Sequence, residues 1–404
     1  MTEEPLGNHA QFIRGVTFKP TDKCEVGKRD SLVCLRTANV QQTLDESDLI
    51  AIPANIVKNP EKLVRLGDIL VSSANSWNLV GRCCRVESLR HPSAAGGFIS
   101  ILRADPSRLD PSYLYRWFAS DHTQATVRSL GNQTTNISNL DHKRTLSLRI
   151  PLPPLPEQKR IAAILDAADA LRAKRRESIE QLDSLVQATF LEMLGDPVTN
   201  PKKWPETSLV SLCRSEDDMR CGPFGTQLHQ NEFAHAGVPL WGIKHVNAGF
   251  SLGTDEFVTH GKAKQLATYC IRAGDLVMTR KGTIGNCHVY PSHLCEGVMH
   301  SDLLRIRLNV SRANPDFLSA QLKYSAGVQH QLRAMSPGAV MPGINVSKLK
   351  NLRVLSPSLD LQTRFASIVE SIEHQKATLK AHLAELDALF SSLQSRAFNG
   401  ELVA

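Results

Sequence analysis

The chain has 404 residues, of which 42% are hydrophobic and 22% charged, with a formal net charge of +7. This length suffices for two or three domains, and the composition is that of a globular protein. The positive charge permits nucleic-acid binding without requiring it. No stretch approaches eighteen consecutive apolar residues, so we predict no membrane-spanning helix.

The N-terminal sequence and the cysteines indicate in which cellular compartment the protein is expected. The chain starts MTEEPLGNHAQF, which lacks an apolar segment, so we expect no signal peptide. Its nine cysteines are irregularly spaced and include no CxxC pair. This usage is typical of reduced thiols and predicts a cytoplasmic protein.

The first 150 residues contain short apolar or alternating segments bounded by Gly, Asn and Pro, and these predict strands. Examples are Val33–Leu35, Ile69–Val71 and Phe98–Leu102. Asp110 precedes Pro111, which is a capping side chain before a proline at the first helical position. We predict an α+β domain with a curved, mostly antiparallel sheet.

Residues 151–195 predict one long amphipathic helix. Four prolines between Pro151 and Pro156 exclude a helix at the start of this segment. Apolar residues then recur at three- and four-residue steps as far as Phe190, and Gly195 is a stop signal. Some forty helical residues would be roughly 60 Å long.

The same helix pattern occurs again 204 positions later, where Leu359, Gln362 and Arg364 repeat Leu155, Gln158 and Arg160. The second copy has apolar residues at every seventh position, as in a coiled coil. Two separate surface helices are the alternative, but both apolar seams are long for one small domain to cover. We predict an antiparallel helix pair, with one globular domain near each end. Its seam comprises Ile161, Ile164, Leu171, Leu182, Phe365, Ile372, Leu379, Leu386 and Leu393.

The period extends outside the helices, so the chain is predicted to be two copies of one unit. Gly274-Asp275 repeats Gly67-Asp68, and Asn314-Pro315 repeats Asp110-Pro111. We divide the chain into a first domain (1–150), a first helix (151–195), a second domain (196–354) and a second helix (355–404). We also align Asn136–Ser138 with Asn345–Ser347.

The second domain opens with a predicted strand, Lys203–Leu212, for which we find no counterpart in the first. Either the true start of the protein lies upstream of Met1, or Glu401–Ala404 packs where that strand would be.

This organisation resembles the specificity subunit of type I restriction–modification systems over nearly the whole chain. The PLPPLPEQKRI entry to the first helix and the SRAFNGEL ending of the second carry the resemblance. It implies two target recognition domains, each binding one half of a bipartite double-stranded DNA site, and helices that set the spacing. It also implies docking of two modification subunits, which methylate adenine, and the joining of restriction subunits. The specificity subunit would be non-catalytic and hold no cofactor, with S-adenosylmethionine, ATP and Mg bound by its partners.

Base recognition requires Arg, Lys, Asn, Gln and hydroxyl side chains on loops that reach the grooves. Two loops per domain have this character. One follows the Gly-Asp strand (72–82 and 279–285), and the other precedes the exit to the helix (131–136 and 336–345). Solvated turns are the alternative for any single residue. The candidate DNA-binding residues are Asn75, Ser76, Asn78, Arg82, Gln133, Thr134, Asn136, Thr279, Arg280, Lys281, Thr283 and Asn345.

Some short patterns suggest catalysis or metal binding, but structural explanations fit them better. Asp110-Pro111-Ser112-Tyr113 is faintly similar to the DPPY motif of adenine methyltransferases. The second copy has Asn-Pro-Asp-Phe there, so what repeats is a helix cap. Cys287 and His288 are adjacent and would point to opposite faces of a strand, so we predict no zinc site in their cluster with His293 and Cys295. No GxxxxGK[ST] motif for nucleotide phosphates occurs.

Two other functions stay open at this stage. One is a coiled-coil scaffold whose repeated domains bind protein, which a DNA pull-down would distinguish. The other is a self-contained DNA methyltransferase or nuclease, which the missing cofactor motifs disfavour.

Overall fold

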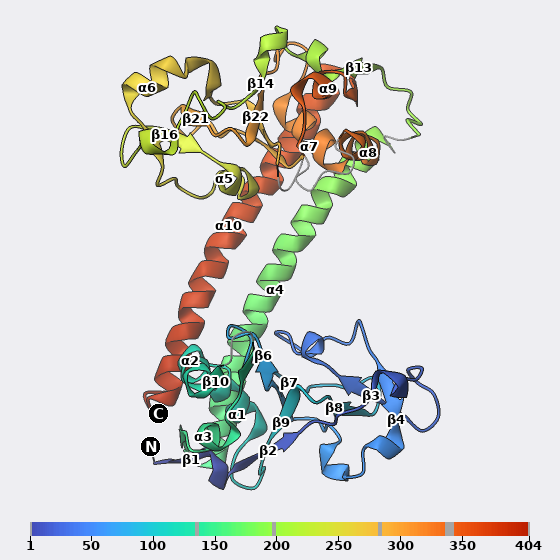
Figure 1. Cartoon of the computed structure of the whole chain (residues 1–404), viewed down its shortest axis with the longest axis vertical. Helices are drawn as coiled ribbons and strands as arrows, with labels where there is room; N and C mark the ends of the chain where they lie inside the picture. The colour runs from blue at the N-terminus through green and yellow to red at the C-terminus, as the bar shows by residue number, and fades with distance from the viewer. Residues whose placement is uncertain (1, 134–136, 196–198, 282–284, 336–342, 403–404) are drawn as a thin grey trace. The chain divides into compact units, whose positions relative to one another are not determined.

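A computed structural model describes residues 2–133, 137–195, 199–281, 285–335 and 343–402. The chain divides into two compact units, the first formed by residues 1–176 and 382–404 and the second by residues 177–381. Each unit contains a β-rich globular part and sections of two long helices, α4 (Leu155–Leu194) and α10 (Leu359–Phe398) (Figure 1). The fold is therefore α+β with a repeated unit, as predicted. No helix among the described residues has the length and apolarity needed to cross a membrane.

The first globular part is built from short strands and three short helices. The strands are β1 (Glu3–Pro5), β2 (Ala10–Arg14), β3 (Ser31–Leu35), β4 (Ala51–Pro53), β5 (Ile69–Ser72), β6 (Ala74–Asn75), β7 (Cys83–Arg85), β8 (Ser93–Ala95), β9 (Ile99–Ala104), β10 (Asn132–Gln133), β11 (Ser138–Asn139) and β12 (Arg149–Pro151). The helices are α1 (Pro111–Phe118), α2 (Asp121–Leu130) and α3 (His142–Leu146).

The second globular part follows the same plan. Its strands are β13 (Glu206–Ser208), β14 (Met219–Cys221), β15 (Phe233–Ala234), β16 (Val238–Trp241), β17 (Phe257–Val258), β18 (Cys270–Ile271), β19 (Leu276–Thr279), β20 (Cys287–Val289), β21 (Gly297–Met299), β22 (Leu303–Ile306) and β23 (Arg353–Leu355). Its helices are α5 (Ile243–Asn247), α6 (His260–Gln265), α7 (Pro315–Tyr324), α8 (Ala326–Ala334) and α9 (Val346–Lys350).

The central sheets of the two units have the same strand order. The first is β2-β9-β5-β7 and the second β14-β22-β19-β20, and all neighbours are antiparallel. A second sheet in each unit contains one parallel pair, β3–β8 or β16–β21. The central strands β5 and β19 are buried along their whole length, which explains why their sequences are continuously apolar rather than alternating.

Buried ion pairs fix the Gly-Asp turns that precede these central strands. Arg103 donates from Nε and NH2 to Asp68 at 2.7 Å for both bonds, and Arg307 pairs with Asp275 at the same distances. Both aspartate side chains are 2% exposed. Planar bidentate pairing satisfies a buried carboxylate and holds the turn against the sheet.

The predicted helix caps are present. Asp110 accepts hydrogen bonds from the first-turn amides of α1, and Asn314 does the same for α7. Helix α4 ends at Leu194, where Gly195 has a φ of +78°, as its role as a stop signal requires.

The prediction that the first domain lacks a counterpart of the opening strand is wrong. Strand β1 pairs with β12 as β13 pairs with β23. Leu6 N then donates to Leu148 O, as Leu209 N donates to Leu352 O. The match was missed because the offset between repeats is 203 residues here and 207 at the Gly-Asp turns, so one fixed period cannot align both.

Helices α4 and α10 pack against each other and run antiparallel within each unit. In the first unit Arg172 Nε lies 2.6 Å from Asp387 Oδ1, while the earlier Arg160 reaches Leu402 O. In the second unit Lys376 Nζ lies 2.7 Å from Asp183 Oδ1, and the centroids of the Phe190 and Phe365 rings are 5.8 Å apart.

The seam residues fall into three groups by exposure. Ile161, Phe365 and Ile372 are buried, whereas Ile164, Leu182, Leu379, Leu386 and Leu393 are half-buried. Leu171 is 56% exposed, so its assignment to the seam is wrong. The adjacent Arg172 instead faces α10, and its guanidinium lies 4.3 Å from the centroid of the Phe390 ring.

Candidate nucleic-acid interface

The two predicted loops of each domain come together in space. In the first unit β6 pairs with β11, so Ala74 lies opposite Asn139, and β11 pairs in turn with β10. In the second unit Lys281 forms an antiparallel bridge with Gly343. Segments about sixty residues apart in sequence therefore meet at one surface in both units.

Backbone hydrogen bonds establish that this surface has the same scaffold in both repeats. Ser73 N donates to Phe98 O, and Arg280 N donates to Asp302 O, both at 2.9 Å. The carbonyl of Ser73 accepts from Leu140 N, and that of Arg280 accepts from Ile344 N. Positions 73 and 280 are therefore structurally equivalent.

In each unit, two backbone segments approach each other closely next to this surface. A Cβ on Gly15 would lie 2.1 Å from Gly96 O, and one on Gly222 would lie 2.1 Å from His300 O. Only glycine allows the backbones to approach so closely. Two positions later, Phe224 lies beside Arg280, whereas Thr17 lies beside Gly97.

The side chains on this common scaffold differ between the units. We use the name loop surface for five equivalent positions in each unit. In the first unit they are Thr17, Ser73, Ala74, Phe98 and Asn139, and in the second Phe224, Arg280, Lys281, Asp302 and Gly343.

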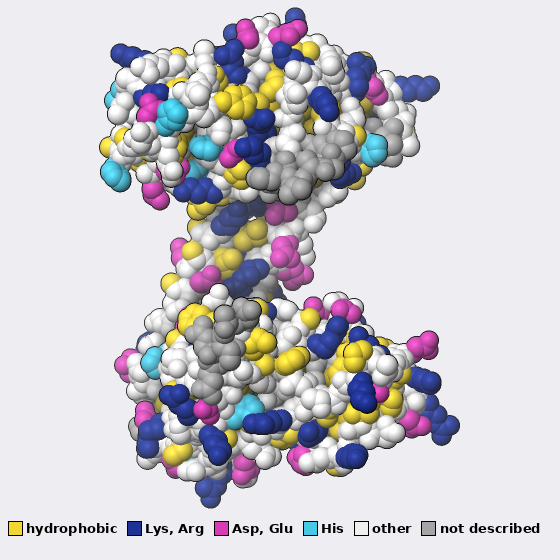
Figure 2. Space-filling model, in the orientation of Figure 1, with side chains coloured by type: hydrophobic (Ala, Val, Ile, Leu, Met, Phe, Trp, Pro, Cys, Tyr) yellow, Lys and Arg dark blue, Asp and Glu magenta, His cyan; other side chains and the backbone are white. Residues whose placement is uncertain are grey.

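Each loop surface lies beside a hollow of different chemistry. In the first unit a hollow of about 490 Å³ is lined mainly by apolar groups, among them Phe18, Ile50 and Phe98. In the second a hollow of about 430 Å³ has a mixed lining, with polar Arg280 and Asn345 beside apolar residues such as Met219 and Phe224. Figure 2 shows that Lys and Arg side chains on the visible face of each unit are scattered among Asp and Glu. On this face, particular side chains rather than one basic patch would therefore provide any specificity.

Comparison with known proteins identifies the family. The model of the type I restriction modification DNA specificity domain matches residues 11–181. The chain is 26% identical to the specificity subunit of the type I restriction enzyme EcoKI of Escherichia coli K12, over 99% of this chain and 89% of that protein. It is 23% identical to the StySPI specificity subunit of Salmonella potsdam, with the same two coverages.

Solved structures show the same fold. The S subunit of a type I system from M. genitalium aligns with a TM-score of 0.58 at 16% identity, over 98% of this chain and 96% of that one. A chain from a type I restriction–modification system studied for complex assembly aligns with a TM-score of 0.54 at 16% identity, over 100% of both chains. Over nearly its whole length the chain is therefore similar to the specificity subunits of type I restriction–modification systems.

The specificity subunit is the DNA-recognition component of a type I restriction–modification system and is itself non-catalytic. Two of the residues considered for metal or catalytic chemistry, Cys287 and Asp110, lie in structural positions. Burial raises the pKa of the Cys287 thiol to about 11, and Asp110 caps a helix. The described residues include no group of three His, Cys, Asp or Glu arranged to hold a metal ion.

The predicted DNA-binding residues of the first unit that the structure describes come from two neighbouring segments, and their exposure differs. Asn75 pairs with Ser138 in the sheet and donates to Ser72 Oγ at 3.1 Å, whereas Ser76 and Asn78 are exposed. Gln133 lies in β10. Thr134 and Asn136 lie outside the described residues.

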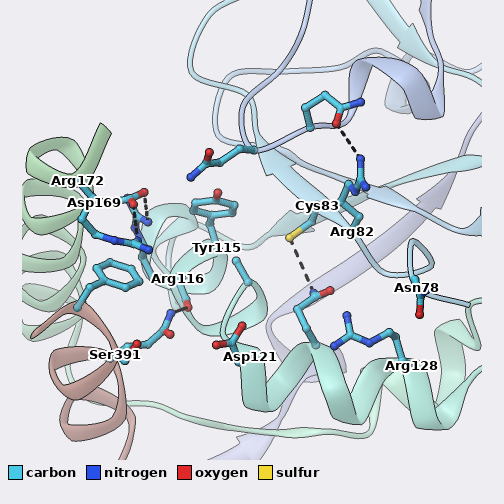
Figure 3. A pocket seen from close by; sticks show the side chains of 16 residues that line it. Asn78, Arg82, Cys83, Tyr115, Arg116, Asp121, Arg128, Asp169, Arg172 and Ser391 are labelled. Atoms are coloured by element: carbon cyan, nitrogen blue, oxygen red, sulfur yellow. Dashed lines mark hydrogen bonds and ion pairs between the residues drawn. The ribbon is translucent and has the colours of Figure 1, made fainter. Parts of the chain in front are cut away.

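Asn78 and Arg82 also line a separate hollow of about 500 Å³ in the first unit (Figure 3). Arg82 NH1 donates to Gln41 Oε1 at 2.7 Å. Figure 3 shows Arg116, Asp169 and Arg172 on the opposite wall, where Arg116 bonds Asp169 at 2.8 Å. Arg82 therefore lies between the loop surface and the helices of its own unit.

Two predicted residues of the second unit have structural roles. Thr279 is fully buried at the end of β19 and its hydroxyl donates to Asn286 O at 3.3 Å, so its assignment to the DNA surface is wrong. Asn345 is exposed, but its side chain caps α9 by accepting from Ser347 N. Thr283 lies outside the described residues, whereas Arg280 and Lys281 are on the loop surface.

The alignment of Asn136 with Asn345 is also wrong. Asp141 caps α3 as Asn345 caps α9, and these two positions are 204 residues apart. The similar letters Asn-Ile-Ser and Asn-Val-Ser suggested a different match, although the cap residues themselves are chemically alike.

Sequence reasoning missed the aromatic residues of the loop surface. Phe98 is 66% exposed and Phe224 is 56% exposed, which is unusual for aromatic side chains. Both stand next to glycine, in Gly96-Gly97-Phe98 and in Pro223-Phe224-Gly225. An aromatic residue in a glycine-rich turn was the available signal.

A repeated cation was missed as well. Arg144 on α3 and Lys348 on α9 are both exposed and occupy equivalent positions. Each donates to a carbonyl of the preceding helical segment, Leu130 O at 3.2 Å or Met335 O at 3.5 Å. These are cations common to both repeats, in contrast to Arg280.

A polar network supports the first loop surface. Ser73 Oγ lies 2.9 Å from Ser100 Oγ, which lies 3.1 Å from Nε2 of His142. Burial, with help from Arg14, lowers the pKa of His142, so the ring is neutral at pH 7. The ring also stacks on Phe12 at 4.6 Å between centroids.

Proposed function

We propose that each globular unit binds one half of a bipartite double-stranded DNA site, and that α4 and α10 set the spacing between the halves. The observation that carries this proposal is the loop surface, where one backbone scaffold presents different side chains in the two units. Phosphates are the same in every DNA sequence, whereas base edges differ. A repeated scaffold with changed side chains therefore suits the recognition of two unlike half-sites.

The helices support the assembly part of the proposal. Each has 40 residues and contributes to both units. Beyond their seam they carry exposed apolar residues, among them Leu171 and Leu185 on α4 and Ile368 and Leu389 on α10. Leu185 and Leu389 are 204 residues apart, so an equivalent apolar position recurs on each helix. Two such positions suit two copies of one partner, the modification subunit.

Partner subunits would then supply the chemistry. Modification subunits would bind S-adenosylmethionine and methylate adenine, and restriction subunits with ATP and Mg would join the larger complex in the cytoplasm. This chain would contribute DNA recognition and spacing alone.

Helix length provides the test. Inserting four residues after Lys174 adds roughly 6 Å of rise with nearly the same rotational phase. The spacer between half-sites should lengthen by about one or two base pairs, since B-DNA rises about 3.4 Å per base pair. Sequencing of methylated sites in cells that carry the modification subunit would show the changed spacer with unchanged half-sites.

A two-residue insertion at the same place is the control. It turns the following seam by about 200° and should abolish assembly and methylation. An active four-residue variant with an unchanged spacer would contradict the proposed role of the helices. A wild-type methylation motif without two separated halves would contradict the whole proposal.

A further inference from the structure

We propose that Arg280 recognises a guanine in the major groove, and that the half-site bound by the second unit therefore contains a guanine essential for recognition. This inference rests on the proposed function and assigns a base to one residue of the loop surface.

Among the described residues the Arg280 guanidinium has few and weak hydrogen-bond partners. The group lies 5.3 Å from the centroid of the Phe224 ring, which occupies its face and fixes its plane. NH1 reaches Ser301 O only at 3.5 Å, which is long for a hydrogen bond. Nε is buried and has no hydrogen-bond acceptor among the described residues.

A buried unpaired donor is costly, so an acceptor is expected to complete it. Arg280 lines the mixed polar and apolar hollow of the second unit, from which a ligand would approach. Guanine presents O6 and N7 side by side in the major groove, and a planar guanidinium donates to both at once.

The adjacent cation does not have this freedom. Lys281 Nζ lies 2.7 Å from Asp302 Oδ1. Although burial opposes it, the Lys281 ammonium lowers the pKa of Asp302, so the carboxylate is charged and neutralises the lysine. The same carboxylate would repel a phosphate placed beside Arg280.

Comparison of the repeats favours a base over a phosphate as the ligand of Arg280. Because phosphates occur in both half-sites, a residue that contacts phosphate should be a cation in both units. Arg144 and Lys348, which occupy equivalent positions, fit this description. Position 280 is instead serine in the first unit, Ser73, on the same hydrogen-bonded backbone. A residue that changes while its scaffold is retained is expected to contact what differs between the half-sites.

The test uses the complex of this chain with its modification subunits and a duplex containing its methylation motif. Each guanine of both half-sites is replaced in turn by 7-deazaguanine, which lacks N7, or by inosine, which keeps O6 and N7. For one guanine we expect 7-deazaguanine to weaken binding by roughly 5- to 150-fold, whereas inosine leaves it unchanged.

The variant Arg280→Ser introduces the residue that the first repeat tolerates on this scaffold. Its complex should lose the penalty for 7-deazaguanine at that guanine, and its methylation motif in cells should accept other bases there. Arg280→Lys, which keeps a donor to guanine but not the planar, stacked donor pair, should reduce this discrimination without abolishing it. Arg312→Ala, which removes a cation of the second unit outside the loop surface, is the matched control and should retain it.

A penalty that persists in Arg280→Ser, or a specific wild-type complex with no guanine sensitive to 7-deazaguanine, would overturn this inference alone. So would an Arg280→Ser complex of wild-type thermal stability that binds no DNA of any sequence, because that outcome indicates a phosphate contact. A wild-type complex that bound all duplexes equally would overturn the proposed function as well.

Discussion

Positions 73 and 280 make the same two backbone hydrogen bonds, yet one carries a hydroxyl and the other a guanidinium. The same contrast occurs along the loop surface, where Phe98 is replaced by Asp302 and Thr17 by Phe224. The ion pairs beneath it, Arg103–Asp68 and Arg307–Asp275, do not change. The repeat therefore retains the groups that shape the backbone and varies those that face outward.

The packing of each globular part on its own sections of α4 and α10 shows a second difference. In the first unit Arg116 of α1 bonds Asp166 at 2.6 Å and Asp169 at 2.8 Å. The equivalent residue of α7, Ala320, packs in an apolar cluster that includes Phe190 and Phe365. At this position the first unit has ion pairs to its helices where the second has apolar packing, so equivalent changes should have unequal effects.

The glycines beneath the loop surfaces should give the largest and most symmetric effect. Gly15→Ala and Gly222→Ala each place a Cβ 2.1 Å from a backbone oxygen, so each should destabilise its own unit by about 3 kcal/mol or more. Hydrogen–deuterium exchange, followed separately on β2 and β14, would measure this. Gly225→Ala, where a Cβ would meet nothing within 4 Å, is the control. Unchanged exchange in β14 of the Gly222 variant would contradict the equivalence of the two scaffolds.

Arg116→Ala should have a smaller effect, confined to the first unit. It introduces the alanine of the second repeat and removes the 7% exposed Arg116, so that, among the described residues, Asp166 keeps only Arg85 and Asp169 keeps only Arg172 as a paired cation. Removing one member of a buried pair costs about 3 kcal/mol, and the partial exposure of both carboxylates should reduce this to about 2.

Exchange rates along α1 would show the loss, with those along α7 unchanged. Arg149→Ala is the control, because its pair with Glu3 is exposed on both sides and should contribute less than about 1 kcal/mol. Equal destabilisation by the two variants would show that the ion pairs of Arg116 do not hold α1 against α4.

Much of this architecture could be predicted because it is local in sequence. Proline and glycine positions define α4, and capping residues followed by proline define the starts of α1 and α7. These signals act within a few residues, so a single sequence contains them. The repeat then extended each prediction to the second half of the chain.

The candidate site was harder to predict because it depends on pairing between distant segments. Thr279 and Arg280 are adjacent and both polar, so the sequence makes them equally plausible as DNA-binding residues. Only the structure separates them, because the buried strand β19 ends at Thr279. Leu171 was assigned to the seam because it is apolar, although the rotation of α4 places Arg172 there. Unequal offsets between repeats hid β1, because a single period cannot follow insertions.

The smallest predicted effect concerns an acid-sensitive group that only one central sheet has. His288 of β20 pairs with Val277, and its equivalent in β7 is Cys84, which pairs with Leu70. Burial lowers the pKa of His288 to about 4, and Lys323 and Lys376 add to this effect while Glu373 opposes it. Burial raises the pKa of Cys84 to about 12, so that thiol stays neutral throughout the acid range.

Because the folded pKa of His288 lies below its unfolded value of about 6.5, protons bind the unfolded state more strongly. The stability of the second unit should therefore be complete above pH 6.5 and decline as the pH falls toward 4. At pH 5 the loss should be on the order of 2 kcal/mol. His288→Cys, the residue of the first repeat, should remove this decline, as measured by exchange protection of β20 at pH 7 and pH 5. Strand β7 is the internal reference, because any effect of His142 protonation on the first unit is the same in the wild type and in the variant. A variant whose β20 still lost protection to the wild-type extent would show that other groups cause the acid sensitivity.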